Sequence, residues 1–408
     1  MNILTFCLSL LKNANIESNI GTFLHITDIH IDPNYQPNTP THCLGDAIGL
    51  ACCNKLSIPL PHTNYSKYWG DKKCDIPIYT LTSTLKWINT NIDNINFILY
   101  GGDTIGHHEF SSSYSKNMKT MTTFSKVFND SFPDIPKYST QGNHDTFPID
   151  QTPPSIITDF RSILSNQWDE YLTRDAIVNY TKYGYYYVKI ENNLTLININ
   201  SLDYDANNMF KIKDLKLDTQ WQFLDDIMLY NKYDKFIILG HIFPYASEST
   251  MLYNTQLLNW MQKNKERILI SLFGHTHNDE FHLYKVKSRT TPLTSDNLVS
   301  SMITPSFMPD GQDPRFRIYY YDKTTKEILD YLQYYVDLDE SNNQNQLLVK
   351  VDYRFSEEYH QSSINIESLL DIYQKKDNNT YCKHYDGRNT IKTKCNMDIF
   401  QEILIDVS

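Results

Sequence analysis

The sequence contains 408 residues, of which 40% are hydrophobic, enough to bury the core of one large α/β catalytic domain with a smaller appendage. A formal net charge of −11 argues against a nucleic-acid polymer as partner, because such a partner requires a basic surface. The apolar run at residues 3–11 is too short to span a bilayer and is typical of a secretory leader. Residues 1–20 are therefore predicted to be a signal peptide.

A loop and then a helix are predicted after the first strand of the chain. Residues 36–74 are rich in proline, asparagine and cysteine with little periodicity, which predicts a loop closed by disulfides. Asp75 is a candidate N-cap for the next helix, whose first turn tolerates Pro77. Apolar residues recurring every three or four positions predict one buried helical face: Ile78, Leu81, Leu85, Ile88 and Ile92. Strands predicted at residues 23–27 and 95–100 flank this helix, and such a crossover implies a parallel strand pair.

Strands and helices are predicted to alternate along the rest of the chain. Apolar stripes at residues 160–172 and 221–228 predict two further helices. Residues 185–190 and 194–198 predict a β-hairpin. The other expected strands span residues 135–139, 236–239, 268–272, 281–286, 299–303, 316–321 and 328–337.

These elements predict a mixed two-sheet α/β sandwich with helices outside. The polar segment 339–346 is predicted to be a loop, and the chain beyond residue 358 to be helical and packed on the catalytic domain. We therefore expect a catalytic domain over residues 21–340 and a C-terminal subdomain over residues 341–408.

Five of the predicted strands end in metal-binding residue types, usually beside glycine. These residues are Asp28 and His30, Asp103, Asn143, His241, and the pair His275 and His277. Aligned parallel strands would gather these side chains at one edge of a sheet. Their nitrogen and oxygen donors suit Zn, Fe or Mn. Seven ligands are too many for one tetrahedral ion and fit two ions about 3.5–4 Å apart that share a carboxylate and a water.

The motif order resembles the calcineurin-like metallophosphoesterase superfamily, and further matches resemble acid sphingomyelinase and its acid sphingomyelinase-like phosphodiesterase relatives. These matches are Cys43 with Cys52-Cys53, Tyr68-Trp69-Gly70, Lys73 to Pro77, Gly102-Asp103 with His107, Gly142 to Asp145 with Pro148, Gly240 to Pro244, Phe273 to His277 with Glu280-Phe281, and Ile303 to Ser306. The resemblance runs from about residue 22 to the C-terminus. It implies a metallophosphoesterase sandwich of two mixed sheets flanked by helices, with a small helical C-terminal subdomain.

The resemblance also implies a site with two divalent ions, zinc being the first choice. One ion would be held by Asp28, His30 and His277, the other by Asn143, His241 and His275, with Asp103 bridging them. A hydroxide bridging the ions would attack phosphorus in line. His107 and His144 would contact the phosphate, and one of them would protonate the leaving group. The resemblance does not determine which of the two is the acid. His108 is an alternative to His107, and Asp145 either orients His144 or caps a turn.

Cysteines and glycosylation sequons point to an oxidising compartment. Six cysteines remain once Cys7 leaves with the leader, and an even number favours disulfides. By resemblance the pairs are Cys43–Cys52, Cys53–Cys74 and Cys382–Cys395. Sequons for N-glycosylation occur at Asn64, Asn129, Asn179, Asn193 and Asn378. A secreted or lysosomal/vacuolar location is therefore expected.

The function implied by the resemblance is metal-dependent phosphodiester hydrolysis, with sphingomyelin cleaved to ceramide and phosphocholine. The segment before Asp28 is too short for the saposin-like lipid-handling domain that acid sphingomyelinase carries upstream. Alternatives are a nucleotide or phosphoanhydride phosphodiesterase, an endopolyphosphatase, and a non-catalytic binding protein on the same fold. The expected partner is a phospholipid head group or a nucleotide, with transient membrane-surface contact and no dedicated protein partner.

Overall fold

The computed structural model describes residues 19–44, 52–107, 112–167, 169–213, 218–286, 292–376, 378–385 and 404–407. Residues 1–18 of the predicted signal peptide, His108 and Cys395 lie outside these ranges. None of the helices in the described part of the chain is both long and apolar enough to cross a membrane.

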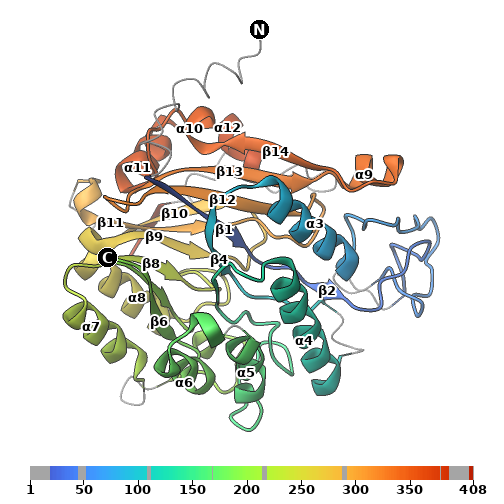
Figure 1. Cartoon of the computed structure of the whole chain (residues 1–408), viewed down its shortest axis with the longest axis horizontal. Coiled ribbons are helices and arrows are strands. Elements are labelled where there is room, and N and C mark those ends of the chain that lie inside the picture. The colour runs from blue at the N-terminus through green and yellow to red at the C-terminus, as the bar shows by residue number, and fades with distance from the viewer. Residues whose placement is uncertain are drawn as a thin grey trace.

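Two mixed sheets form the body of the protein, as the sequence predicts (Figure 1). The six-stranded sheet has the order β14-β13-β12-β1-β4-β5. Its strands are β1 (Ile20–Ile26), β4 (Ile95–Tyr100), β5 (Lys137–Ser139), β12 (Arg315–Asp322), β13 (Ile328–Val336) and β14 (Val349–Arg354). β1, β4 and β5 are parallel to one another, whereas β12 to β14 pair in antiparallel fashion.

The seven-stranded sheet has the order β15-β10-β11-β9-β8-β7-β6. Its strands are β6 (Tyr186–Glu191), β7 (Leu194–Asn198), β8 (Lys235–Leu239), β9 (Ile268–Phe273), β10 (Glu280–Lys285), β11 (Leu298–Ile303) and β15 (Leu404–Asp406). A short parallel pair, β2 (Ile31–Asp32) and β3 (Ile76–Pro77), lies outside both sheets. The predicted hairpin is confirmed as the antiparallel pair β6–β7.

Helices cover the outer faces of the sandwich, with α3 and α4 at the right of Figure 1 and α7 and α8 at the left. The described helices are α3 (Ile78–Asn91), α4 (Tyr114–Ser131), α5 (Ile157–Gln167), α6 (Arg174–Tyr183), α7 (Gln220–Tyr230), α8 (Met251–Asn264), α9 (Leu338–Gln344), α10 (Phe355–Glu358), α11 (Ile366–Lys375) and α12 (Asn378–Tyr385). The predicted strand–helix–strand unit is confirmed as β1–α3–β4, with β1 and β4 parallel.

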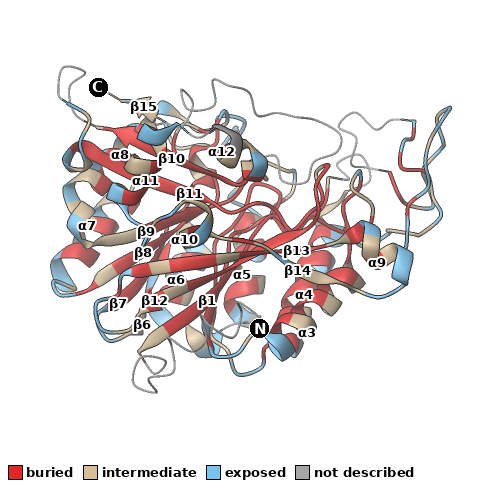
Figure 2. Ribbon diagram, turned by 90° about the horizontal axis from the view of Figure 1, so that it is seen from above, coloured by how far each residue is buried: buried red, intermediate tan, exposed pale blue. Residues whose placement is uncertain are grey.

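The central strands are apolar because both of their faces are buried. Along β8, Ile237 and Leu239 join the core between the sheets, whereas Phe236 and Ile238 join a second core under α7 and α8. Alternating side chains of a strand point to opposite faces, so one short strand contributes to both cores. Figure 2 shows this as almost unbroken burial along the inner strands. The strands therefore have fixed positions from which their carboxyl ends can present side chains.

Two local predictions are wrong. The polar segment after β13 contains helix α9 rather than a loop, because the Asp337 side chain accepts a hydrogen bond from the backbone N–H of Glu340 and Leu338 is buried. Asp75 does not cap α3, whose N-cap is Pro77 without a side-chain hydrogen bond. Its carboxylate accepts hydrogen bonds from His107 instead.

The chain beyond residue 358 contains the predicted helices, α11 and α12, but it also contributes the strand β15, which pairs with β10. The strand β14 pairs with β13, so the chain beyond residue 340 also contributes to the six-stranded sheet. A division between two domains at residue 340 stays a prediction.

A projecting lobe is formed by residues 33–44 and 52–74, which we call the disulfide lobe (Figures 1 and 2). Two of the expected disulfides close it, Cys43–Cys52 and Cys53–Cys74, with Cα–Cα distances of 5.8 and 6.1 Å. Cys382 is also disulfide-bonded, and its expected partner Cys395 lies outside the described residues.

Candidate dinuclear metal centre

The seven predicted ligands lie together where strands from both sheets end, and the predicted location at one edge of a single sheet is wrong. Asp28, Asp103 and Asn143 follow β1, β4 and β5 of one sheet, and His241 and the segment with His275 follow β8 and β9 of the other. Backbone hydrogen bonds join the strand ends: Asp28 N–H donates to Gly102 O at 2.9 Å, and Gly274 N–H donates to His241 O at 3.1 Å. Backbone contacts thus join the loops after β1 and β4 and those after β8 and β9, before their side chains are considered.

The backbone is strained at five of the seven positions. Positive φ angles occur at Asp28 (50°), His30 (45°), Asp103 (62°), His275 (79°) and His277 (66°). This region is uncommon for residues with a side chain, and such outliers gather at functional sites where the surrounding structure enforces them. The cluster of outliers therefore supports a functional role for these loops.

Two glycines allow the loops to approach. A Cβ on Gly142 would lie 2.0 Å from Asp103 Oδ1, and a Cβ on Gly274 would lie 2.2 Å from Asp28 Oδ2. Any side chain at these positions would displace a predicted carboxylate ligand. The glycines beside the ligands in the sequence are therefore a steric requirement of the site.

The orientation of His241 leaves a lone pair inside the site. Its Nδ1–H donates to Gly101 O at 2.8 Å, so the neutral ring has an unprotonated Nε2. This Nε2 lies 2.9 Å from Asn143 Oδ1 and 3.2 Å from Asp103 Oδ2. The amide of Asn143 is oriented by its Nδ2, which donates to Asp150 Oδ1 at 2.8 Å. Three acceptor atoms therefore face one another, an arrangement that a cation between them would satisfy.

His30 repeats this arrangement on the other side of Asp103. Its Nδ1–H donates to Ile105 O at 2.8 Å, and its Nε2 lies 3.2 Å from His277 Nε2 and 3.4 Å from Asp103 Oδ2. His277 Nε2 lies 3.6 Å from Asp28 Oδ1. The same oxygen of Asp103 thus faces both histidine groups, as a bridging carboxylate would.

The protonation states of the buried residues also fit cation binding. Burial lowers the pKa of His30 well below its ordinary value, which leaves the imidazole in its ligating form. Although burial opposes it, His241 and His144 lower the pKa of Asp103 well below its ordinary value. Against the same opposing burial, Asp103 raises the pKa of His241 to about 10, so without an ion a proton on Nε2 stands where the cation would. The site therefore favours a positive charge, which divalent ions would supply.

Asp145 joins the loops that carry two of the ligands. Its carboxylate accepts backbone N–H hydrogen bonds from Asp103 at 2.8 Å, Thr104 at 2.7 Å and Gly142 at 3.0 Å. This is a turn-capping role extended to two loops, and it fixes Asp103 relative to the residues after β5.

His107 and His144 lie beside the His30 group. Their ring centroids are 4.6 Å apart, and those rings lie 4.2 and 4.7 Å from the ring of His30. His107 donates from Nδ1 to Asp75 Oδ1 at 2.8 Å. Burial lowers the pKa of His144 to about 3, and its Nδ1 has no hydrogen-bond partner among the described residues. Both rings are thus placed to contact a substrate at the ions.

The segment after β9 is anchored by the C-terminal half of the chain. The carbonyl of His277 accepts hydrogen bonds from Gln312 Nε2 at 2.6 Å and from Ser306 N–H at 3.2 Å. Buried Asp279 pairs with Arg317 and accepts a hydrogen bond from Tyr353 at 2.7 Å. Residues from β12 and β14 therefore hold the predicted His-x-His ligands in place.

The structure also places three carboxylates against histidines of the site, and the sequence did not predict these contacts. Asp75 bonds His107, Glu248 Oε2 lies 2.9 Å from His275 Nε2, and Asp310 Oδ2 lies 3.7 Å from His277 Nδ1. Only Asp75 lies within a motif of the resemblance, and nothing in the local sequence of Glu248 or Asp310 signals a contact. Each carboxylate contacts the outer nitrogen of a histidine, meaning the ring nitrogen that faces away from the other ligands. These contacts are determined by the fold and not by local sequence.

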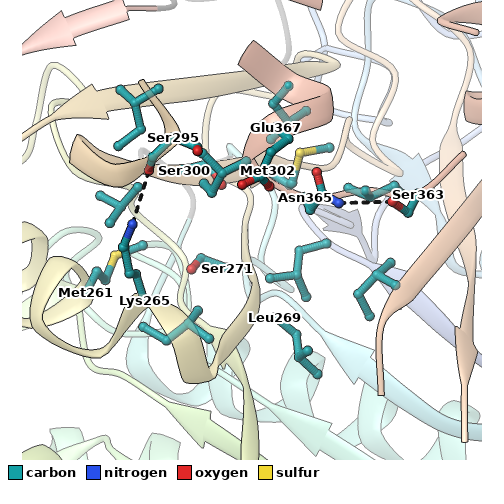
Figure 3. Close-up of a pocket in the computed structure, with 18 of the residues that line it drawn as sticks. Met261, Lys265, Leu269, Ser271, Ser295, Ser300, Met302, Ser363, Asn365 and Glu367 are labelled. Atoms are coloured by element: carbon teal, nitrogen blue, oxygen red, sulfur yellow. Dashed lines mark hydrogen bonds between the residues drawn. The ribbon is translucent and has the colours of Figure 1, made fainter. Parts of the chain in front are cut away.

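A separate cavity of about 300 Å³ lies between α8, β9, β11 and α11 (Figure 3). Met261, Lys265, Ser271, Met302 and Glu367 are among its lining residues. The seven predicted ligands, all within the described part of the chain, do not line it. Ser271 lies on β9 four residues before His275, so this cavity is distinct from the cluster at the strand ends.

Comparisons with known proteins agree with this geometry. A family model for calcineurin-like phosphoesterases matches residues 21–279, and one for the acid sphingomyelin phosphodiesterase C-terminal region matches residues 295–388. Sphingomyelin phosphodiesterase A of Dictyostelium discoideum is 26% identical over 387 residues, which cover 92% of this chain and 64% of that protein. Cyclic GMP-AMP phosphodiesterase SMPDL3A of Mus musculus is 26% identical over 388 residues, with 90% of this chain and 83% of that protein covered.

A third relative is the sphingomyelin phosphodiesterase of Bos taurus, which is 26% identical over 339 residues covering 79% of this chain and 52% of that protein. The chain thus spans about half to two thirds of the sphingomyelin phosphodiesterases that it matches. The first family model alone covers more than half of the 408 residues. The chain belongs to the calcineurin-like phosphoesterase family and carries the C-terminal region of acid sphingomyelin phosphodiesterases.

Proposed function

We propose that this chain is a phosphodiester hydrolase that uses two divalent ions, zinc being our choice because imidazole and carboxylate donors suit it. One ion would be held by Asp28, His30 and His277, the other by Asn143, His241 and His275, and Asp103 would be shared by both. The observation that carries the proposal is the group of facing acceptors formed by Asn143 Oδ1, His241 Nε2 and Asp103 Oδ2.

Bound divalent ions supply a water of lowered pKa and stabilise charge on a phosphoryl group. The protein's part is to hold the ligands and limit the charge around them. Asn143 contributes a neutral oxygen, whereas Asp28 and Asp103 are the two carboxylates of the set. Two carboxylates against two dications leave a net positive site, which suits an anionic phosphodiester.

His107 and His144 divide the remaining work in our proposal. His107 protonates the leaving oxygen, because the Asp75 carboxylate on its Nδ1 stabilises the ring when it carries a proton on both nitrogens. His144 contacts the phosphoryl group, because its ring lies 4.6 Å from that of His107 and 4.7 Å from that of His30. Asp75 is thus a positioning residue for His107.

The first substrate that we propose is sphingomyelin, cleaved to ceramide and phosphocholine. Two of the relatives described above are named sphingomyelin phosphodiesterases. A second candidate is a nucleotide phosphodiester or phosphoanhydride, because the nucleotide phosphodiesterase SMPDL3A is covered over 83% of its length.

Turnover by the zinc-loaded protein would distinguish these substrates. The panel contains sphingomyelin in detergent, cyclic GMP-AMP, ATP, bis-p-nitrophenyl phosphate and polyphosphate. We expect phosphocholine release from sphingomyelin to have the highest kcat/KM. A higher kcat/KM for a nucleotide would favour the second candidate. A higher kcat/KM for polyphosphate would indicate an endopolyphosphatase. No turnover of any substrate by protein with two bound ions would indicate a non-catalytic binding protein.

We also propose that the disulfide lobe contacts the membrane surface that presents the lipid. Leu44, Leu56 and Ile58 are 66%, 83% and 60% exposed, and Leu44 N–H donates to Ile58 O at 2.8 Å, which places two of them on paired segments. Lys55 on the same lobe is exposed as well. The lobe ends at Cys74, next to Asp75, whose carboxylate bonds His107, so the chain of the lobe leads directly into the site.

Replacing Leu44, Leu56 and Ile58 together by serine tests this contact. Full burial of such a side chain is worth about 1.5–3 kcal/mol, so partitioning should fall by at least about tenfold even when insertion is partial. Sedimentation with vesicles of sphingomyelin and phosphatidylserine measures it. The matched control replaces Leu229, Tyr230 and Tyr233, which are also exposed but lie at the end of α7. Equal binding by both variants would exclude the lobe as the contact.

The compartment that we propose is the secretory route, either outside the cell or in the lysosomal/vacuolar lumen. The two disulfides of the lobe support it, because such bonds persist in oxidising compartments. The sequons at Asn64 and Asn193 are exposed, which an acceptor site requires. Glycosylation at the five sequons and cleavage of the leader remain predictions.

A further inference from the structure

Among the four histidines of the candidate centre, His275 differs in that Nε2 rather than Nδ1 makes the outer contact. His30 and His241 each donate from Nδ1 to a backbone carbonyl, so their Nε2 atoms face the site. In His275 the roles are exchanged: Nδ1 lies 3.1 Å from Asn143 Oδ1, and Nε2 lies 2.9 Å from Glu248 Oε2. A side-chain carboxylate therefore replaces the carbonyl as the outer partner.

The contact with Glu248 determines which nitrogen of His275 has the lone pair. A carboxylate accepts and does not donate when ionised, so Nε2 must carry the hydrogen in this contact. In the neutral ring, Nδ1 is then unprotonated and directed at Asn143 Oδ1, an oxygen that also faces His241 Nε2. The carboxylate also makes the imidazole more electron-rich, which strengthens a metal–nitrogen bond.

Glu248 is itself held in place by the loop between β8 and α8. Ser247 Oγ donates to Glu248 Oε2 at 2.5 Å, and Ala206 N–H donates to the Glu248 carbonyl at 2.6 Å. A further backbone bridge joins Ser249 to Asp205. The Glu248 side chain is one-third exposed, so its removal leaves no cavity in the core.

We propose that Glu248 is a positioning residue for one ion of the pair, acting through His275 to hold Nδ1 as the ligand atom. The ion concerned is the one assigned to Asn143, His241 and His275, and the inference rests on the proposed two-ion function. The other ion, assigned to Asp28, His30 and His277, does not depend on Glu248. The loop between β8 and α8 thus controls the affinity of one half of the centre.

Metal affinity measures this role directly. Metal-free protein is titrated with Zn²⁺ in competition with a chromophoric chelator, and Co²⁺ substitution reports the ligand geometry through its visible absorption. Loss of an outer partner of a ligating histidine typically weakens affinity by about 10–100-fold. In Glu248→Ala the affinity for one of the two ions should fall by this factor, and the affinity for the other should stay at the wild-type value. Glu248→Gln keeps a hydrogen-bond acceptor, so its affinity for the first of these ions should lie between the values of the wild type and of Glu248→Ala.

Glu266→Ala is the matched control, because the Glu266 side chain is 86% exposed and lies outside the centre. The inference is overturned when Glu248→Ala binds both ions as tightly as the wild type does, or when its affinities for both ions fall equally. A wild-type protein that binds no ion would instead contradict the proposed function itself. The two failures are therefore distinguishable in one set of titrations.

Discussion

Replacing Asp103 by asparagine is expected to remove metal from both halves of the centre and to abolish most of the activity. The same Oδ2 atom lies 3.4 Å from His30 Nε2 and 3.2 Å from His241 Nε2, so both groups lose their shared carboxylate. Removing even an outer partner of a ligand costs about 10–100-fold in affinity or activity, so a bridging ligand should cost more than about 100-fold. Elemental analysis of dialysed protein together with kcat/KM checks both expectations.

The matched control for this substitution is Asp130→Asn on the exposed face of α4, where the side chain is 63% exposed. It should bind metal and turn over substrate as the wild type does. Asp103 is fully enclosed and its neighbour Gly142 touches it, so the thermal unfolding of both variants should also be measured. Full metal occupancy with normal activity in Asp103→Asn would exclude the bridge.

The second large effect is expected at His107 and His144, and the leaving group should separate their roles. His107→Ala removes the proposed acid and should lower kcat on sphingomyelin by about 10²–10⁴-fold. On bis-p-nitrophenyl phosphate the loss should be much smaller, because p-nitrophenolate leaves without a proton. His144→Ala removes a contact to the phosphoryl group and should lower kcat on both substrates by about 10²–10³-fold.

Both variants should keep the wild-type metal content, since neither residue is an assigned ligand. The control is His42→Ala, an exposed histidine of the disulfide lobe. Equal losses of His107→Ala on the two substrates would contradict its role as the acid. Near-wild-type turnover of sphingomyelin by His144→Ala would exclude its contact with the phosphate.

The positions of most strands, and the metal-binding residue types after them, could be predicted because both are encoded locally. Strands such as β8 are apolar on both faces, which marks a buried parallel strand in the sequence itself. The predicted ligands lie after strand ends, which parallel alignment brings together within one sheet. They follow strands of both sheets, however, so packing of the two sheets is also needed to form the cluster. Asp28 and His275, 247 positions apart, follow β1 and β9 of different sheets, so their contact depends on that packing.

Contacts between loops could not be predicted in this way. Asp75 lies 32 positions from His107 and stands before a helix, so its local context offered capping as a sufficient explanation. Glu248 lies 27 positions from His275 in a loop without periodicity. Helix α9 was missed because its sequence is almost entirely polar and its stability depends on the Asp337 cap and on burial of Leu338.

Comparison of the four histidines shows how the fold controls the chemistry of the site. Backbone carbonyls orient His30 and His241, and these carbonyls belong to the residues directly around Asp103, namely Gly101 and Ile105. Side-chain carboxylates contact the outer nitrogens of His275 and His277. The first pair is therefore oriented by backbone of the loop after β4, whereas the second is oriented by side chains of other loops.

The most direct test of the account is an anomalous difference map from crystals of the protein soaked in zinc, collected at the zinc absorption edge. We predict two peaks about 3.5–4 Å apart, with Asp103 between them. One peak should lie next to His30 and His277 and the other next to Asn143, His241 and His275. A single peak away from Asp103, or no peak at these strand ends, would contradict the two-ion centre.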